Sequence, residues 1–236
     1  MDREATNLLV EKFGRKYSDI LGINLKTKDD GEIFKWFLAS VLFGAPINEN
    51  SVIRTYKRFE SHEVLAPEKI LETGWDGLVK ILDEGGYARY DFKTSDKLLE
   101  VMGNLLVKYE GSLNLIHERA SDSYDLEKRL KDLGKGVGDV TVSIFMRELR
   151  DLWNKADSKP TSLVILAAKN LGIVREESPE KALGELKEFW RKNEGAGKTF
   201  VNFETALLRL GKNLCRKKKC RECVLERYCL VIASGC

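Results

Sequence analysis

The sequence predicts an all-α protein. Apolar residues recur every three to four positions along most of the chain, which is the spacing of one buried helix face, and no stretch alternates as a half-buried strand would. Glycine and proline divide these segments into helices of ordinary length, without an internal repeat. The 236 residues, 43% of them apolar, suffice for one large or two small domains.

The first half of the chain is a succession of predicted helices. Acidic residues at 29–32 predict the capped start of a strongly apolar helix that Gly44 ends. Proline at 67 predicts a helix start, and Gly85 with Gly86 predicts a stop. The expected helices cover residues 4–13, 33–42, 48–59, 67–71 and 75–82.

The second half continues the pattern. Helices are expected over 92–109, on both sides of a central glycine turn, and then over 163–171, 179–190 and 201–210. A charged connector at 147–159 separates the turn region from the last three helices. The four tryptophans are expected to anchor the core; they are Trp36, Trp75, Trp153 and Trp190.

The central glycine turn reads Leu133-Gly-Lys-Gly-Val-Gly-Asp-Val-Thr141. Three glycines within five positions predict a tight turn that directs its backbone N–H groups outward. Such a turn at a helix N-terminus is typical of a phosphate-binding site, although an ordinary helical hairpin has the same pattern. Asp139 is expected to cap the second helix.

Composition limits the class of protein. The formal net charge of +3 is small, so any nucleic-acid interface must be local. No apolar stretch is long enough for a membrane span, and the charged start at 1–4 does not resemble a signal peptide, so we expect a cytoplasmic protein. A charged fraction of 33% with no glutamine favours a thermophilic source.

The cysteines form a separate motif near the C-terminus. All five lie within the last 22 residues, so they cannot staple the rest of the chain. Four of them could bind one zinc ion or one [4Fe–4S] cluster, and spacing alone does not choose between these; they are Cys215, Cys220, Cys223 and Cys229. Cys236 is expected to be a spare.

The cysteine loop is also strongly basic. It combines seven cationic side chains with only two acidic ones, which predicts a phosphate-binding patch rather than a merely solvated surface; the cationic residues are Lys212, Arg216, Lys217, Lys218, Lys219, Arg221 and Arg227.

The glycine hairpin and the cysteine loop together resemble the endonuclease III branch of the helix-hairpin-helix DNA glycosylases, which carry a [4Fe–4S] cluster. The segment 37–52 is similar to the first core helix and DNA-facing loop of that family, and Gly136-Val137-Gly138 with Thr141 matches its hairpin. The resemblance implies a six-helix barrel domain over 28–148. It also implies a cluster domain built from 1–27 and 149–236, with the four-cysteine loop at 215–229. Four residues, not the family's six, separate the first two cysteines, so zinc remains the alternative cofactor.

The same resemblance implies double-stranded DNA as the partner of a monomeric prokaryotic, nucleoid-associated protein. The segment 86–90, with Lys93, is similar to the family's wedge loop, so Tyr87 or Tyr90 would fill the gap left by a flipped base. The other expected DNA contacts come from the hairpin and the basic loop; they are Gly134, Lys135, Gly136, Gly138, Thr141, Arg216, Lys217, Lys218 and Lys219.

The catalytic residues depart from the family pattern. Val140 occupies the position of the Schiff-base lysine of bifunctional members, which argues against lyase activity. Two alignments place the family's catalytic aspartate at Ser158 or Thr161, and Asp157 is the nearest carboxylate. Asp157 is therefore the candidate catalytic residue of a monofunctional glycosylase acting on a damaged or mismatched base. Two alternatives stay open, namely a turn aspartate in an active enzyme and a non-catalytic DNA-binding relative.

Overall fold

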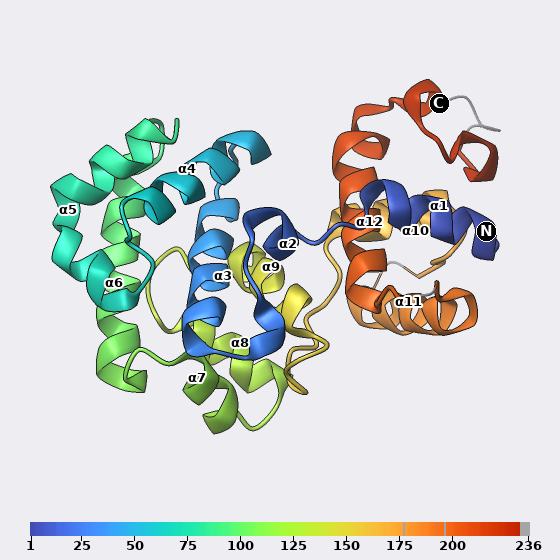
Figure 1. The fold of residues 1–236 in the computed structure, drawn as a ribbon. Helices are drawn as coiled ribbons and strands as arrows, with labels where there is room; N and C mark the ends of the chain where they lie inside the picture. Colours follow the sequence, from blue (N-terminus) through green and yellow to red (C-terminus); the bar gives the residue numbers. More distant parts are fainter. Residues whose placement is uncertain (177, 196, 232–236) are drawn as a thin grey trace. The chain divides into compact units, whose positions relative to one another are not determined.

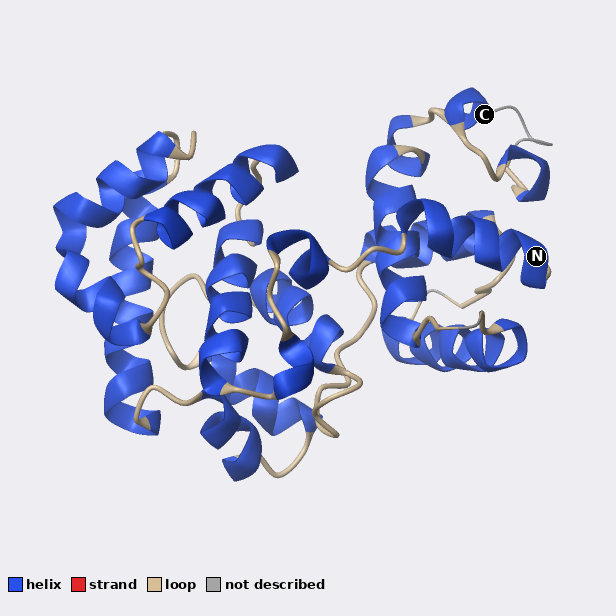
Figure 2. Ribbon diagram, viewed as in Figure 1, coloured by secondary structure: helices blue, strands red, loops and turns tan. Residues whose placement is uncertain are grey.

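The computed structural model describes residues 1–176, 178–195 and 197–231, so Cys236, expected as a spare thiol, lies outside the described residues. Every regular element among the described residues is helical, which confirms the all-α prediction (Figure 2). The chain divides into two compact units. We call residues 18–158 the contiguous unit, and residues 1–17 with 159–236 the split unit. The sequence-based boundaries were 28–148 for the barrel domain, with 1–27 and 149–236 for the cluster domain.

The contiguous unit contains most of the helices (Figure 1). They are α2 (Tyr17–Leu21), η1 (Leu25–Thr27), α3 (Asp30–Phe43), α4 (Glu49–Ser61), α5 (Pro67–Glu84), α6 (Asp91–Tyr109), α7 (Leu113–Arg119), α8 (Ser123–Lys131) and α9 (Asp139–Leu149). The split unit contains α1 (Arg3–Phe13), α10 (Ser162–Asn170), α11 (Pro179–Asn193), α12 (Phe200–Asn213) and the short 3₁₀ turns η2 (Cys215–Lys217), η3 (Cys220–Glu222) and η4 (Glu226–Tyr228).

Helix α3 is the centre of the contiguous unit. Asp29 caps it by accepting hydrogen bonds from the backbone N–H groups of Gly31 and Glu32, as the acidic start of this segment predicts. The helix is apolar on nearly every face and packs against α4, α7 and α9. The Trp36 indole N–H donates to the carbonyl oxygen of Phe145 at 3.0 Å, which fixes α9 against α3. The second helix of the glycine hairpin is therefore held by the core.

The predicted helix positions agree with the structure, with local differences. The expected break between 67–71 and 75–82 is a kink at Gly74, where φ is 65°. Helix α7 was not predicted, because its seven residues bury only Leu113 and Ile116 and are too short for a clear periodic pattern. Trp75 was wrongly expected in the core. It is 38% exposed, lies beside Phe92 with ring centroids 5.1 Å apart, and donates its indole N–H to Asp96.

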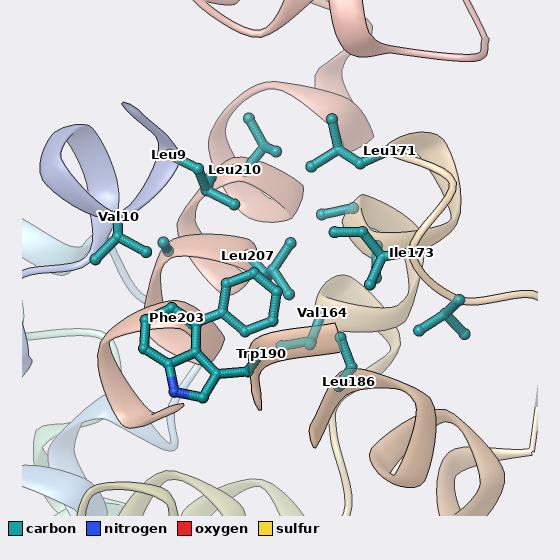
Figure 3. Packing of buried hydrophobic residues seen from close by; sticks show 14 of the residues in the cluster. Leu9, Val10, Val164, Leu171, Ile173, Leu186, Trp190, Phe203, Leu207 and Leu210 are labelled. Atoms are coloured by element: carbon teal, nitrogen blue, oxygen red, sulfur yellow. The ribbon is translucent and has the colours of Figure 1, made fainter. Parts of the chain in front are cut away.

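The split unit has its own apolar core around α12 (Figure 3). Leu9 and Val10 of α1 enter this core from one chain end, and Phe203 stacks on Trp190 with ring centroids 5.3 Å apart. Leu225 of the cysteine loop is fully buried in the same cluster, which anchors the loop to the unit. None of the described helices has the length and hydropathy that a membrane span requires.

Candidate nucleic-acid interface

One face of α6 holds the glycine turn between α8 and α9. The side-chain amide of Asn104 donates to the carbonyl oxygen of Leu133 at 2.8 Å, and the ammonium group of Lys108 donates to the carbonyl oxygen of Asp132 at 3.2 Å. Both acceptors are carbonyls of the chain that leaves α8, where a helix end lacks internal partners. Sequence reasoning missed these two residues, although their spacing with Lys97 and Val101 follows one helix face.

The three glycines of the turn have different surroundings. A Cβ atom on Gly134 would lie 2.9 Å from Cγ2 of Val101, which is too close for unchanged packing. Gly136 has φ at 91°, and a Cβ there would lie 2.5 Å from Cε of Lys97. Apart from its own chain neighbours, no described heavy atom lies within 4 Å of a Cβ placed on Gly138. Gly134 and Gly136 therefore let the turn pack on α6, whereas Gly138 borders open space.

The N-terminus of α9 lacks a side-chain cap. Its N-cap residue is Gly138, and the first backbone hydrogen bond of the helix runs from the N–H of Val142 to the carbonyl of Gly138. Among the described residues, the N–H groups of Asp139, Val140 and Thr141 make no hydrogen bond. These donors and the helix dipole make this end of α9 suitable for an anion.

Asp139 does not cap α9, contrary to prediction. It is the first residue of the helix, its side chain is 90% exposed, and its carboxylate lies 2.5 Å from the ammonium group of Lys131 on α8. The ion pair joins the two helices of the hairpin and offsets the negative charge of Asp139 at the open helix end. Lys135 is in the turn between the two helices.

Two expected DNA contacts are buried instead. Thr141 is 3% exposed, and its hydroxyl packs against Gly44 at the end of α3, so its side chain serves the α3–α9 contact. Tyr87 is fully buried, and its hydroxyl donates to the carbonyl oxygen of Leu42 at 2.5 Å. Its ring cannot fill a gap in DNA without leaving the core. The expected contact of the Tyr87 ring is therefore wrong, and Thr141 could contact DNA only through its backbone N–H group, because the sequence does not reveal which side chains of these two segments face inward.

Tyr90 remains at the surface of the expected wedge loop. Its ring is partly exposed and forms an edge-to-face pair with the ring of Tyr87, with centroids 6.3 Å apart. The guanidinium group of Arg89 lies 5.8 Å from the centre of the same ring. An aromatic ring paired with a cation can contact a base and a neighbouring phosphate together.

Asp157 lies in the loop between α9 and α10, not at a helix start. The N-cap of α10 is Thr161, four residues later. Nη1 of Arg150 donates to the carboxylate of Asp157 at 2.6 Å, and Nη2 of the same side chain donates to the carbonyl oxygen of Ser158. The Arg150 side chain is 6% exposed, whereas that of Asp157 is 44% exposed. Arg150 therefore fixes the orientation of a carboxylate that solvent can reach, and sequence reasoning gave Arg150 no role.

The basic loop exposes its charges. Arg216, Lys217, Lys218 and Lys219 are all exposed, and Lys219 pairs with Glu222 at 2.9 Å. Within the described part of the chain, no ion pair involves Arg216, Lys217 or Lys218. The loop is tied to its unit by buried Leu225 and by the hydrogen bond from the N–H of Leu230 to the carbonyl of Asn170 at 2.8 Å. Its free cations are thus presented on an anchored segment.

The four predicted metal ligands share this loop but are not equivalent. Cys215, Cys223 and Cys229 are free thiols, whereas Cys220 is disulfide-bonded. The pKa of Cys215 is raised, mainly by burial and to a smaller extent by repulsion from Cys223 and Cys229. Soft thiolates suit zinc or iron–sulfur clusters. The described residues nevertheless include no group of three or more His, Cys, Asp or Glu side chains arranged to hold a metal, so the chemistry of the donors fits but their arrangement is not a closed site.

The sequence was compared with models of known protein families and with curated proteins. No model of a known protein family matches the chain, and no curated protein matches its sequence.

Proposed function

We propose that this chain binds double-stranded DNA through the hairpin formed by α8, the glycine turn and α9, in the manner of a helix-hairpin-helix DNA glycosylase. The observation that carries the proposal is the uncapped N-terminus of α9, which borders open space at Gly138. Backbone donors at such an end can bind a DNA phosphate without reading the base sequence. Lys131 offsets the charge of Asp139 at this end, and Lys135 adds a cation to the turn.

The reaction that we propose is hydrolysis of the N-glycosidic bond of a damaged or mismatched base. The bond between C1′ and the base nitrogen breaks, and its electron pair leaves with the base. The carboxylate of Asp157 stabilises the developing positive charge on the sugar and accepts a proton from the water that attacks C1′. Arg150 orients that carboxylate. Val140 offers no amine, so we expect an abasic site as the product rather than a cleaved strand.

The second candidate is a DNA-binding relative without catalysis. The ion pair between Arg150 and Asp157 supports this candidate. Because the guanidinium group lies 2.6 Å from the Asp157 carboxylate, part of the carboxylate charge is neutralised before any substrate binds. Both candidates require the hairpin to bind DNA, and they differ only in the role of Asp157.

We also propose that the cysteine loop holds a metal centre, with a [4Fe–4S] cluster as the first candidate and zinc as the alternative. The support is the clustering of four cysteines within 15 residues of the sequence, three of which are free thiols. All four could act as ligands only with Cys220 reduced. The role would be structural, since a metal would fix the loop that presents Arg216–Lys219. Metal analysis of anaerobically purified protein, with iron, sulfide and zinc measured together, distinguishes the two candidates from an empty loop.

A single-turnover assay tests the catalytic proposal. Duplexes carrying a panel of lesions and mismatches are incubated with excess wild-type protein, Asp157→Asn, or the matched control Asp151→Asn from the same exposed loop. We expect base release that falls by orders of magnitude in Asp157→Asn and persists in Asp151→Asn. Salt-sensitive DNA binding without product from any duplex would favour the non-catalytic relative. A wild-type protein that does not bind DNA would overturn both candidates.

A further inference from the structure

Lys97 on α6 lies directly against the glycine turn. A Cβ atom built on Gly136 would lie 2.5 Å from Cε and 3.3 Å from Nζ of Lys97, so the end of this side chain covers Gly136. Lys97 begins the face of α6 that continues through Val101, Asn104 and Lys108 and holds the turn. Its ammonium group therefore lies beside the turn.

Lys97 differs from the other lysines around the hairpin. Lys108 donates to a backbone carbonyl and Lys131 pairs with Asp139, but the described residues provide neither a hydrogen bond nor an ion pair for Nζ of Lys97. The side chain is partly buried, and burial lowers its pKa because the charged form loses solvation without gaining a partner. An anion beside Nζ would supply the missing partner.

Because the end of Lys97 covers Gly136, it lies near the proposed phosphate site at the N-terminus of α9. Gly136 is two residues before Gly138, the open N-cap of α9. Lysine binds phosphate as a point charge, and this complements backbone N–H donors, which contribute direction but little net charge. The turn therefore combines open backbone donors at the start of α9 with an unpaired ammonium group beside Gly136.

We propose that Lys97 is a DNA-binding residue of this interface, contacting a backbone phosphate at the glycine turn from α6. The inference rests on the proposed function, because it needs DNA at the hairpin. It goes further by assigning part of the phosphate site to a helix outside the hairpin itself.

The salt dependence of DNA binding tests this assignment. Each phosphate contact contributes about 0.9 to the slope of log K against log salt concentration, so losing one contact lowers the slope by about 0.9 and the affinity by about fivefold at 0.15 M salt. Binding of wild-type protein, Lys97→Met, Lys97→Arg and the control Lys80→Met to one undamaged duplex would be measured over a salt series. Lys80 is an exposed lysine on α5.

We expect Lys97→Met to lose about one contact, Lys97→Arg to keep the wild-type slope, and Lys80→Met to match the wild type. An unchanged slope in Lys97→Met, with DNA binding intact in the wild type, would overturn the Lys97 assignment and leave the proposed function standing. No binding by the wild type would overturn both.

A second experiment uses only the wild-type chain, so its result does not depend on whether a variant folds. Lysine amines would be labelled with an acylating reagent, with and without duplex, and quantified by mass spectrometry. We expect DNA to slow labelling of Lys97 severalfold and to leave Lys80 unchanged. Equal labelling of Lys97 with and without saturating DNA would overturn the assignment.

Discussion

Tyr87 lies in the core of the contiguous unit, where its hydroxyl donates to the carbonyl oxygen of Leu42. We predict that Tyr87→Phe lowers the free energy of unfolding by about 1 kcal/mol near neutral pH, because the buried carbonyl loses its donor. The variant should bind DNA as the wild type does, since the ring does not reach the surface. Urea unfolding and a binding titration measure the two quantities. A loss of DNA affinity without a loss of stability would contradict the buried position.

The same residue predicts a pH dependence. Burial raises the pKa of Tyr87 above its ordinary value of 10.0, so the folded chain keeps this proton at a pH where the unfolded chain releases it. Its contribution to stability is therefore complete below pH 10 and falls as the pH rises further. Tyr87→Phe should reduce the loss of stability above pH 10 without abolishing it, because burial also raises the pKa of Tyr56. Tyr124→Phe, at a position 78% exposed, is the control and should leave the pH profile unchanged.

At the scale of elements, the glycine turn consists of positions with different requirements. We predict that Gly136→Ala lowers the free energy of unfolding by about 1–3 kcal/mol, because alanine is strained at a φ of 91°, and that the end of the Lys97 side chain shifts to make room for the methyl group. Gly138→Ala should change it by no more than about 1 kcal/mol, because that residue has an extended backbone and open surroundings. Chemical denaturation of both variants is the measurement. An equal decrease in the free energy of unfolding in both variants would mean that Gly138 is as restricted as Gly136.

Helix α6 contacts the hairpin through residues whose role cannot be predicted from the sequence of the helix alone. The sequence predicts its length and apolar face, which agree with the helix Asp91–Tyr109. The polar residues Asn104 and Lys108 on the side that meets the hairpin look like ordinary surface residues in a sequence. Their partners are carbonyls 29 and 24 residues away, so their function depends on how the chain returns to α6.

At the scale of the whole molecule, the two units differ in the number of chain segments that form them. The contiguous unit is a single segment with its own core, whereas the split unit needs α1 from the other end of the chain to cover α12. We predict that a fragment of residues 18–158 folds with helical circular dichroism and a cooperative thermal transition. A fragment of residues 159–236 should fold only when a peptide of residues 1–17 is added, because Leu9 and Val10 complete its core. A cooperative, helical 159–236 fragment without the peptide would contradict this dependence.

The candidate site was only partly predictable. The glycine turn was found from its sequence because three glycines in five positions restrict the backbone locally. Asp157 was chosen by its distance along the chain from the hairpin, and its ion pair with Arg150 could not be foreseen from spacing. The metal centre stays a prediction, because the donor chemistry is evident in the sequence while its arrangement is not.

The sequence by itself determined the helical class, the approximate starts and ends of the longer helices, and the position of the turn. These features depend on neighbours within a few residues, as with the caps Asp29 and Asn48. Only the tertiary structure decided that Tyr87 and Thr141 face inward and that Lys97 covers Gly136. An amphipathic side chain such as tyrosine suits either a core or a surface, so its place is set by contacts between residues far apart in the chain.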